Sequence, residues 1–295
     1  MRHCGAGPGS GARPLRYGGG VLSIEQVPQL DDPVMIVSFT GWVDGGLAGA
    51  GAAAVLVDGL ASSRTCARFD LAEYVDLQQT RPTVSLVDGE TRKIHWPTIE
   101  LVAGVAGRDV LVVTGPEPSV RWKVVTDELV AFAAQAGVKE AVLLGGMPAP
   151  VSHRRPIAVH ATAATRSVAQ EIGALRADYV GPTGIQSVLQ VALGAAGIRA
   201  VGLWAQVPHY VAGTPSPPAI RALLQRLDEL TRVHVDLQGL DDQIDSYLEQ
   251  VESGLADRPD VAALVTQLEE AAGPEELPSG DDLAREIERF LRDEG

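Results

Sequence analysis

Short apolar runs alternate with longer helical segments through the middle of this chain. The clearest apolar runs lie at 34–39, 109–114, 140–144 and 199–205. Glycine or proline follows each run within three residues, which is typical of buried strands that end in turns. Segments with the length and composition of helices lie between them, at 45–60, 120–136 and 184–196. This alternation predicts an α/β fold in which helices cover both faces of a largely parallel sheet.

A tight hairpin interrupts the alternation. Two stretches of strand-forming residues, 83–87 and 90–95, flank the dipeptide Asp88-Gly89. This dipeptide readily adopts the positive φ angles of a two-residue hairpin turn. We expect the antiparallel hairpin to make the sheet mixed. Weaker strand patterns occur at 68–70, 98–102 and 157–163.

The negative charge of the chain lies at its C-terminal end. The net charge is −14, and residues 236–295 hold 18 acidic and 4 basic side chains, so the first 235 residues are neutral overall. Amphipathic helices are expected at 217–230, 240–252, 261–272 and 281–291. We therefore expect a glycine-rich, disordered leader at 1–20, an α/β core at 21–235 and an acidic helical extension at 236–295. The extension is either a solvated helical surface or a surface for a basic protein partner.

Several functional classes are excluded by composition. No basic face suited to nucleic acid is visible, and no apolar run reaches the roughly 18 residues of a membrane span. The N-terminus has no apolar segment of a secretory signal. Two cysteines, Cys4 and Cys66, fit reduced thiols in a cytoplasmic protein. We expect no metal and no cofactor, because metal-ligand spacings and nucleotide-binding or hydrolase motifs are missing and none of the three lysines lies in a glycine-rich loop.

Candidate ligand-binding residues lie where the predicted strands end. Parallel strands bring their carboxyl ends to one edge of the sheet, where ligands of α/β proteins bind. Helices that begin there present free backbone amides, which favour an anion. The candidates are Gly41, Trp42, Asp44, Gly45, Gly145, Gly146, His153, Arg154, Thr183, Gly184, Trp204, His209 and Tyr210. No catalytic residue can be assigned among them.

Structural roles compete with ligand binding at the predicted helix starts. The glycines at 41–46 also suit a helix that packs closely against the sheet. Asp44 would repel a phosphate unless it caps the helix that follows. Thr183 is either the N-cap of the helix that begins near Gly184 or a group that binds a ligand oxygen.

The charged candidates also allow two interpretations. His153 and Arg154 form the best cationic cluster of the predicted core, and they could hold a carboxylate or phosphate. They could equally pair with acidic residues of a neighbouring subunit or of the C-terminal helices. His209, next to Tyr210, could act as a general base or be an ordinary polar surface group.

Five segments together resemble one protein family. They are FTGWVDGG at 39–46, TRKIHWP at 91–97, LGGMPAP at 144–150 followed by His153, GPTGI at 181–185, and Trp204 with VPHY at 207–210. In order and spacing they resemble the actinobacterial branch of the proteasome assembly chaperone 2 family, over about residues 21–255. The resemblance implies a three-layer α/β/α sandwich, similar to phosphorylases and peptide hydrolases, with a mixed, mostly parallel sheet and added C-terminal helices. It also implies a homo-oligomer, with a trimer favoured.

The resemblance implies a chaperone-like, non-catalytic role with protein partners such as proteasome subunits. Archaeal relatives dock on proteasome subunits through a hydrophobic–Tyr–X tail, but this chain ends Phe290-Leu291-Arg292-Asp293-Glu294-Gly295 and lacks that tyrosine. Some relatives have been labelled ATP-grasp or carboxylate-amine ligases, which the placement of the lysines disfavours. The alternative is an enzyme or binder of a small anionic ligand, nucleoside- or peptide-like, at the strand ends.

Overall fold

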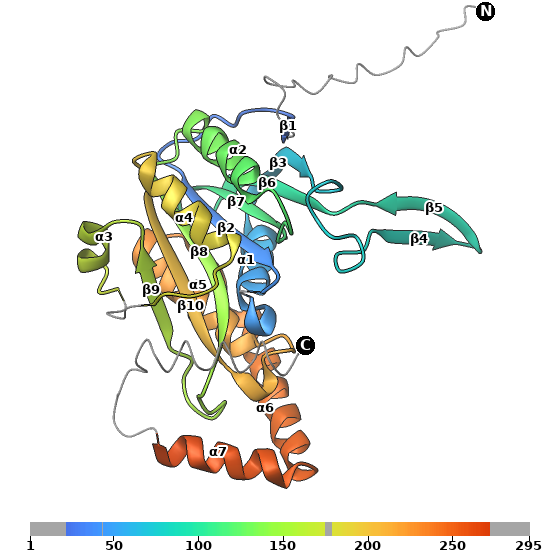
Figure 1. Cartoon of the computed structure of the whole chain (residues 1–295), viewed down its shortest axis with the longest axis vertical. Coiled ribbons are helices and arrows are strands. Elements are labelled where there is room, and N and C mark those ends of the chain that lie inside the picture. The colour runs from blue at the N-terminus through green and yellow to red at the C-terminus, as the bar shows by residue number, and fades with distance from the viewer. Residues whose placement is uncertain (1–21, 43, 175–178, 272–295) are drawn as a thin grey trace, which may run out of the picture.

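An eight-stranded sheet forms the centre of the protein (Figure 1). The computed structural model describes residues 22–42, 44–174 and 179–271. The strand order is β1-β3-β6-β7-β2-β8-β10-β9. The strands are β1 (Leu22–Ile24), β2 (Val34–Thr40), β3 (Ala61–Asp70), β6 (Thr98–Val105), β7 (Asp109–Pro116), β8 (Glu140–Ala149), β9 (Val159–Ala163) and β10 (Arg199–Pro208).

Parallel pairing is confined to the centre of this sheet. The four neighbouring strands β7, β2, β8 and β10 are parallel to one another. The pairs β1–β3, β3–β6, β6–β7 and β10–β9 are antiparallel. The sheet is therefore mixed, as predicted, and its four central strands place their carboxyl ends at one edge.

Helices cover both faces of the sheet, which confirms the predicted three-layer sandwich. Helices α1 (Ala48–Gly59) and α5 (Pro217–Thr231) pack on one face, and α2 (Trp122–Gln135) and α4 (Ile185–Ala195) pack on the other. Short helices lie at η1 (Gly45–Leu47), α3 (Arg166–Glu171), η2 (His209–Val211) and η3 (Gln238–Leu240). Alternate side chains of β2 enter the two cores: Met35 and Val37 face α2 and α4, and Ile36 faces α1 and α5.

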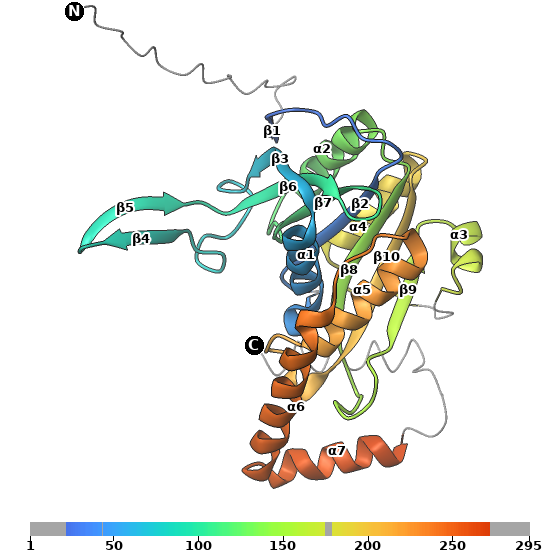
Figure 2. The ribbon, with the colours of Figure 1, turned by 180° about the vertical axis from the view of Figure 1, so that it is seen from behind.

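The predicted hairpin is correct in its bounds but wrong in its placement. Strands β4 (Thr83–Val87) and β5 (Glu90–His95) pair only with each other and form a second, two-stranded sheet. Figures 1 and 2 show that this hairpin, here called the arm, projects from the body of the protein. Pro82 and Pro97 bracket the arm, and a proline has no N–H with which to continue a strand ladder. The main sheet is mixed because of its own outer strands.

Several strands extend further than predicted: β3 begins seven residues earlier, and β6, β7, β8 and β10 end two to five residues later. Gly145 and Gly146 do not lie in a loop after β8, because both belong to the strand and pair with Trp204 and Ala205 of β10. Strand β7 likewise continues through Gly115. Neighbouring strands supply hydrogen bonds that prolong each strand past its apolar run, and glycine does not prevent this pairing.

The C-terminal helices α6 (Asp241–Ala256) and α7 (Pro259–Ala271) lie beyond the carboxyl ends of β8 and β10 (Figures 1 and 2). None of the described helices is long and apolar enough to cross a membrane. The predicted leader at 1–20 and the predicted helix at 281–291 lie outside the described residues. The boundary near residue 235 stays a prediction.

Candidate functional site

The loop after β2 packs directly on the end of β8. A Cβ atom at Gly146 would overlap the carbonyl oxygen of Gly45, and a Cβ atom at Gly49 would overlap that of Leu144. A Cβ atom at Gly41 would lie 2.8 Å from the Glu117 side chain. Gly146 and Gly49 allow two backbones to come into contact, and Gly41 leaves room for the Glu117 side chain, so these glycines have the packing role that the sequence left open.

Asp44 caps helix α1 from inside the protein. Its carboxylate accepts hydrogen bonds from the backbone N–H groups of Gly49 (2.7 Å) and Ala50 (3.2 Å). The residue is 4% exposed, and burial raises the pKa of Asp44 to about 6 although both amides act to lower it. The N–H groups of Gly46 and Leu47 are bonded to backbone carbonyls. The backbone N–H groups that were expected to be free for an anion at this helix start are therefore already hydrogen-bonded within the protein. The prediction that Asp44 caps the following helix is confirmed.

Glu117 occupies the start of helix α4, and sequence analysis missed it. It follows β7, and its carboxylate accepts hydrogen bonds from the backbone N–H groups of Ile185 (2.8 Å) and Trp42 (3.3 Å). Of the two roles left open for Thr183, the N-cap is wrong, because Thr183 is exposed and the N-cap is Gly184, which has no side chain. A carboxylate from a distant loop replaces the local cap. The one feature of the sequence that singles out Glu117 is its position between two prolines at the end of a strand.

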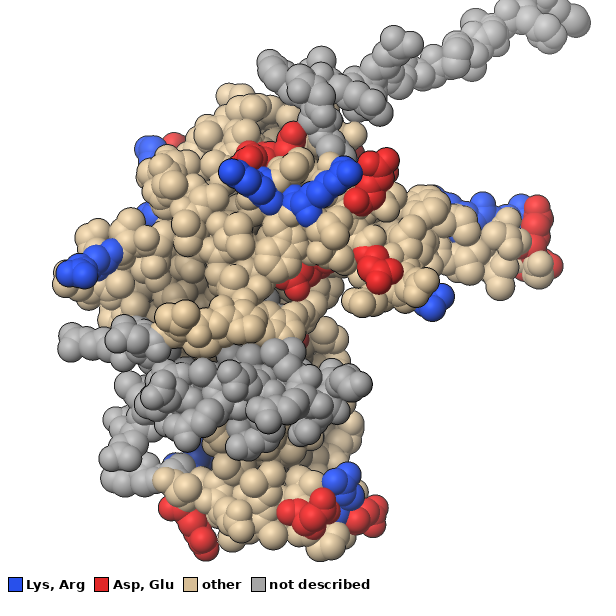
Figure 3. All heavy atoms as spheres, in the orientation of Figure 1, with Lys and Arg blue, Asp and Glu red and all other residues tan. Residues whose placement is uncertain are grey.

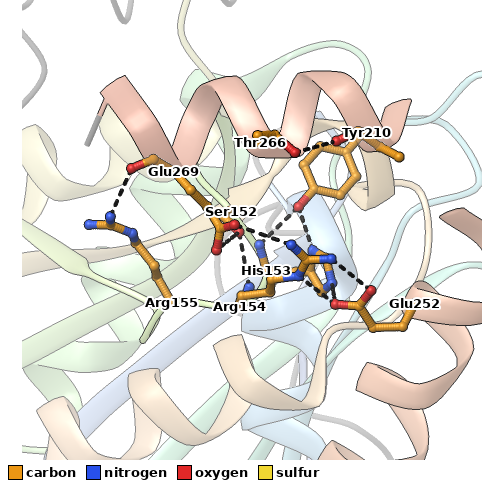
Figure 4. Close-up of polar contacts among 9 residues, drawn as sticks. Ser152, His153, Arg154, Arg155, Tyr210, Glu252, Thr266 and Glu269 are labelled. Carbon is orange, nitrogen blue, oxygen red and sulfur yellow. Dashed lines mark hydrogen bonds and ion pairs between the residues drawn. The ribbon is translucent and has the colours of Figure 1, made fainter. Parts of the chain in front are cut away.

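A second cluster links the loop after β8 to helices α6 and α7 (Figure 4). Arg154 binds the carboxylate of Glu252 with two of its nitrogens, at 2.6 and 2.9 Å, and a third nitrogen lies 3.1 Å from Glu269. Arg154 lowers the pKa of Glu252 to about 2, and His153 contributes further. Of the alternatives left by the sequence, the structure shows pairing with the acidic C-terminal helices. We call Arg154, His153, Glu252 and Glu269 the latch.

His153 is held on both ring nitrogens. Nδ1 lies 2.7 Å from the Tyr210 hydroxyl, and Nε2 lies 3.0 Å from Glu252. The Tyr210 hydroxyl also accepts the backbone N–H of His153 at 2.9 Å, so its own proton is available to Nδ1. Burial raises the pKa of Tyr210, which keeps that proton in place. Nε2–H then donates to the Glu252 carboxylate, so the His153 side chain connects the loop after β8 with η2 and α6.

The other candidates are placed separately. Trp204 is buried and donates from Nε1 to the Thr162 hydroxyl at 3.0 Å. His209 donates from Nδ1 to the carbonyl oxygen of Ala149 at 3.1 Å. The structure thus brings together three groups: Gly41, Trp42 and Gly184 around Glu117; Asp44, Gly45 and Gly146 where the loop after β2 meets β8; and His153, Arg154 and Tyr210 in the latch region. Ligand binding by these residues stays a prediction. Among the described residues, no group of three His, Cys, Asp or Glu side chains could hold a metal ion.

Comparisons with known proteins agree on one family. A family model, the PAC2 family, matches residues 38–255. No curated protein matches the chain. A PAC2 family protein from Streptomyces avermitilis is 40% identical with a TM-score of 0.73, covering 79% of this chain and 100% of its own. A proteasome-assembly chaperone homologue from Mycobacterium tuberculosis is 35% identical with a TM-score of 0.72, covering 79% and 99%.

An archaeal proteasome activator from Pyrococcus furiosus shares the fold. It is 17% identical with a TM-score of 0.65, and the match covers 79% of this chain and 97% of that protein. The two more similar structures come from actinobacteria, the branch that the sequence motifs indicated. The family model matches well over half of the length of this chain, so the chain belongs to the PAC2 family.

Proposed function

We propose that this protein is a non-catalytic, chaperone-like protein that acts in the cytoplasm by binding other proteins, proteasome subunits among them. Membership of the PAC2 family and similarity to a proteasome-assembly chaperone homologue support a chaperone-like role. The arm supports the binding of other proteins in particular, because its surface is suited to a protein partner.

The arm exposes apolar side chains that the body of the protein does not cover. Leu86 is 63% exposed, Trp96 52% and Val84 51%, and Val87 and Ile94 are exposed nearby. Figure 3 shows charged side chains of both signs along the outer part of the arm. An isolated two-stranded hairpin is only marginally stable in water, and exposed apolar patches mark interaction sites. A bound protein would cover these side chains and stabilise the arm.

The strand-end edge supports a non-catalytic role. At the starts of α1 and α4, carboxylates of Asp44 and Glu117 already occupy backbone amides. A small anionic ligand would have to displace these carboxylates, and Asp44 is buried beneath its loop. The described residues thus favour protein binding over the alternative of an anion site.

We also propose a homo-oligomer, with a trimer favoured by the family resemblance. A second set of exposed apolar side chains supports it. Val124 of α2 and Val191 of α4, 42% and 66% exposed, lie on the two helices that cover one face of the sheet. A neighbouring copy that packed on this layer would bury them.

Copurification from a native host tests the proposal. Tagged wild-type protein is expected to recover 20S proteasome subunits. The variant Val84→Asp, which places a charge on the apolar face of the arm, should recover at least tenfold less. Thr83→Asp is the matched control, since Thr83 is exposed on the opposite face of the same strand. Failure of the wild type to recover any subunit would refute the proteasome role. Equal recovery by both variants would show that the arm is not the binding surface.

A further inference from the structure

A groove of about 810 Å³ lies between helix α6 and the segment that joins β10 to α5. Tyr247, Val251 and Leu255 line it from α6, and Val211 and Pro215 line it from the opposite side. Val261, at the start of α7, also contributes. These side chains make one side of the groove apolar, and Gln243, Ser246 and Gln250 of α6 line it beside them. Asp242 and Arg258 line it from the two ends of α6.

The apolar side chains of α6 form one stripe. Tyr247, Val251 and Leu255 are spaced i, i+4 and i+8, so they lie on one side of the helix and span about 12 Å. Glu252 points instead to the latch, where Arg154 and His153 hold it. The latch therefore fixes α6 against the core, and the stripe lines the groove with Val251 half-buried and only the edges of Tyr247 and Leu255 exposed. Rows of this i±4 type are the surfaces on which a second helix packs.

The sequence beyond the described residues contains a stripe with the same spacing. The described chain ends at Ala271, and residues 281–291 are the segment whose pattern predicts an amphipathic helix. Leu283, Ile287 and Leu291 are spaced i, i+4 and i+8 in it. Its apolar stripe therefore has the length of the α6 stripe.

The chain is long enough to bring this segment to the groove. Helix α7 begins beside the groove and has 13 residues, so its far end is about 20 Å away. The nine residues 272–280 separate Ala271 from the segment and can span about 30 Å when extended. A return from the end of α7 to the end of α6 is within this reach.

We propose that residues 281–291 form a helix that docks in the groove of the same chain, antiparallel to α6. The charges at the two ends favour this direction. It places Asp281 and Asp282 near Arg258, which also pairs with Asp260, and it places Arg289, with Arg292 just past the helix, near Asp242. The acidic C-terminal extension is then a three-helix unit that closes its own apolar groove, independently of any proteasome partner.

A cysteine cross-link tests the docking in the full chain. Cys4 is replaced by Ser, and Cys66 is retained because it is fully buried. Val251→Cys with Ile287→Cys should form a disulfide within one chain under mild oxidation. Val251→Cys with Arg285→Cys is the control, since Arg285 lies on the other side of the predicted helix, and it should cross-link at least tenfold less. No bond in the first pair, equal yields, or a bond that joins two chains would each overturn the proposal.

Hydrogen exchange gives an independent measurement. Docking should slow amide exchange in α6 between Tyr247 and Leu255. The variant Ile287→Asp should raise these exchange rates at least tenfold, whereas Arg285→Asp should leave them unchanged. Equal rates in the two variants would contradict docking of the apolar stripe, and so would faster exchange in Arg285→Asp alone.

Discussion

Ionisation of Asp44 should oppose folding near neutral pH. The carboxylate lies under the loop after β2, and burial raises its pKa from 3.8 to about 6. A difference of this size corresponds to about 3 kcal/mol between the folded and unfolded states. Because the folded-state pKa is the higher one, the stabilising contribution is complete below pH 3.8. It is lost as the pH rises through about 6.

The variant Asp44→Asn removes this titration and keeps one oxygen that can accept the Gly49 N–H. The free energy of unfolding of the wild type should fall by up to about 3 kcal/mol, relative to that of the variant, between pH 4 and pH 7. Urea unfolding followed by circular dichroism at each pH measures both proteins. All other carboxylates are the same in the two proteins, so the difference between their curves of unfolding free energy against pH reports Asp44 alone.

Asp58→Asn is the matched control, because it removes an exposed carboxylate at the other end of the same helix and leaves Asp44 in place. Parallel curves for wild type and Asp44→Asn would refute the reasoning. A wild type that gained stability relative to Asp44→Asn as the pH rose would show that the two amides outweigh burial.

Three further changes test the contacts described above. Arg154→Ala should lower the free energy of unfolding by about 1 kcal/mol, since the pair is half exposed, and should speed proteolysis between α6 and α7. The lowered pKa of Glu252 predicts a contribution that is present above pH 4.5 and lost as the pH falls toward 2, and Glu252→Gln should remove this acid dependence in urea unfolding. Gly146→Ala should cost about 3 kcal/mol in thermal unfolding because its Cβ would overlap the Gly45 carbonyl, whereas Gly239→Ala, where space is open, should change little.

Elements with a strong local pattern could be predicted from the sequence. The arm strands β4 and β5 have the predicted bounds, because the turn at Asp88-Gly89 fixes their register. Strand β2 differs from its prediction by one residue at its end, and helix α4 by one residue at each end. Apolar runs, helical periodicity and turn chemistry all act within a few residues, so a single sequence carries them.

Features that depend on distant partners could not be predicted in this way. Gly145 reads as a strand end, but hydrogen bonds from β10 keep it within β8. Thr183 reads as a helix cap, but Glu117 comes from a different loop to bind the first amide of α4. The sequence offered Arg154 three kinds of partner, and only the position of α6 selects Glu252.

The sequence by itself determined the α/β class, the approximate positions of most strands and helices, and the concentration of acidic charge at the C-terminal end. Tertiary structure alone decided which strands are neighbours, that the arm stands apart from the sheet, and which carboxylates fill the starts of α1 and α4. The reason is the range of the forces involved. Backbone preference and side-chain periodicity are local, whereas each contact of Asp44, Glu117 and Arg154 depends on the path of the chain between its partners.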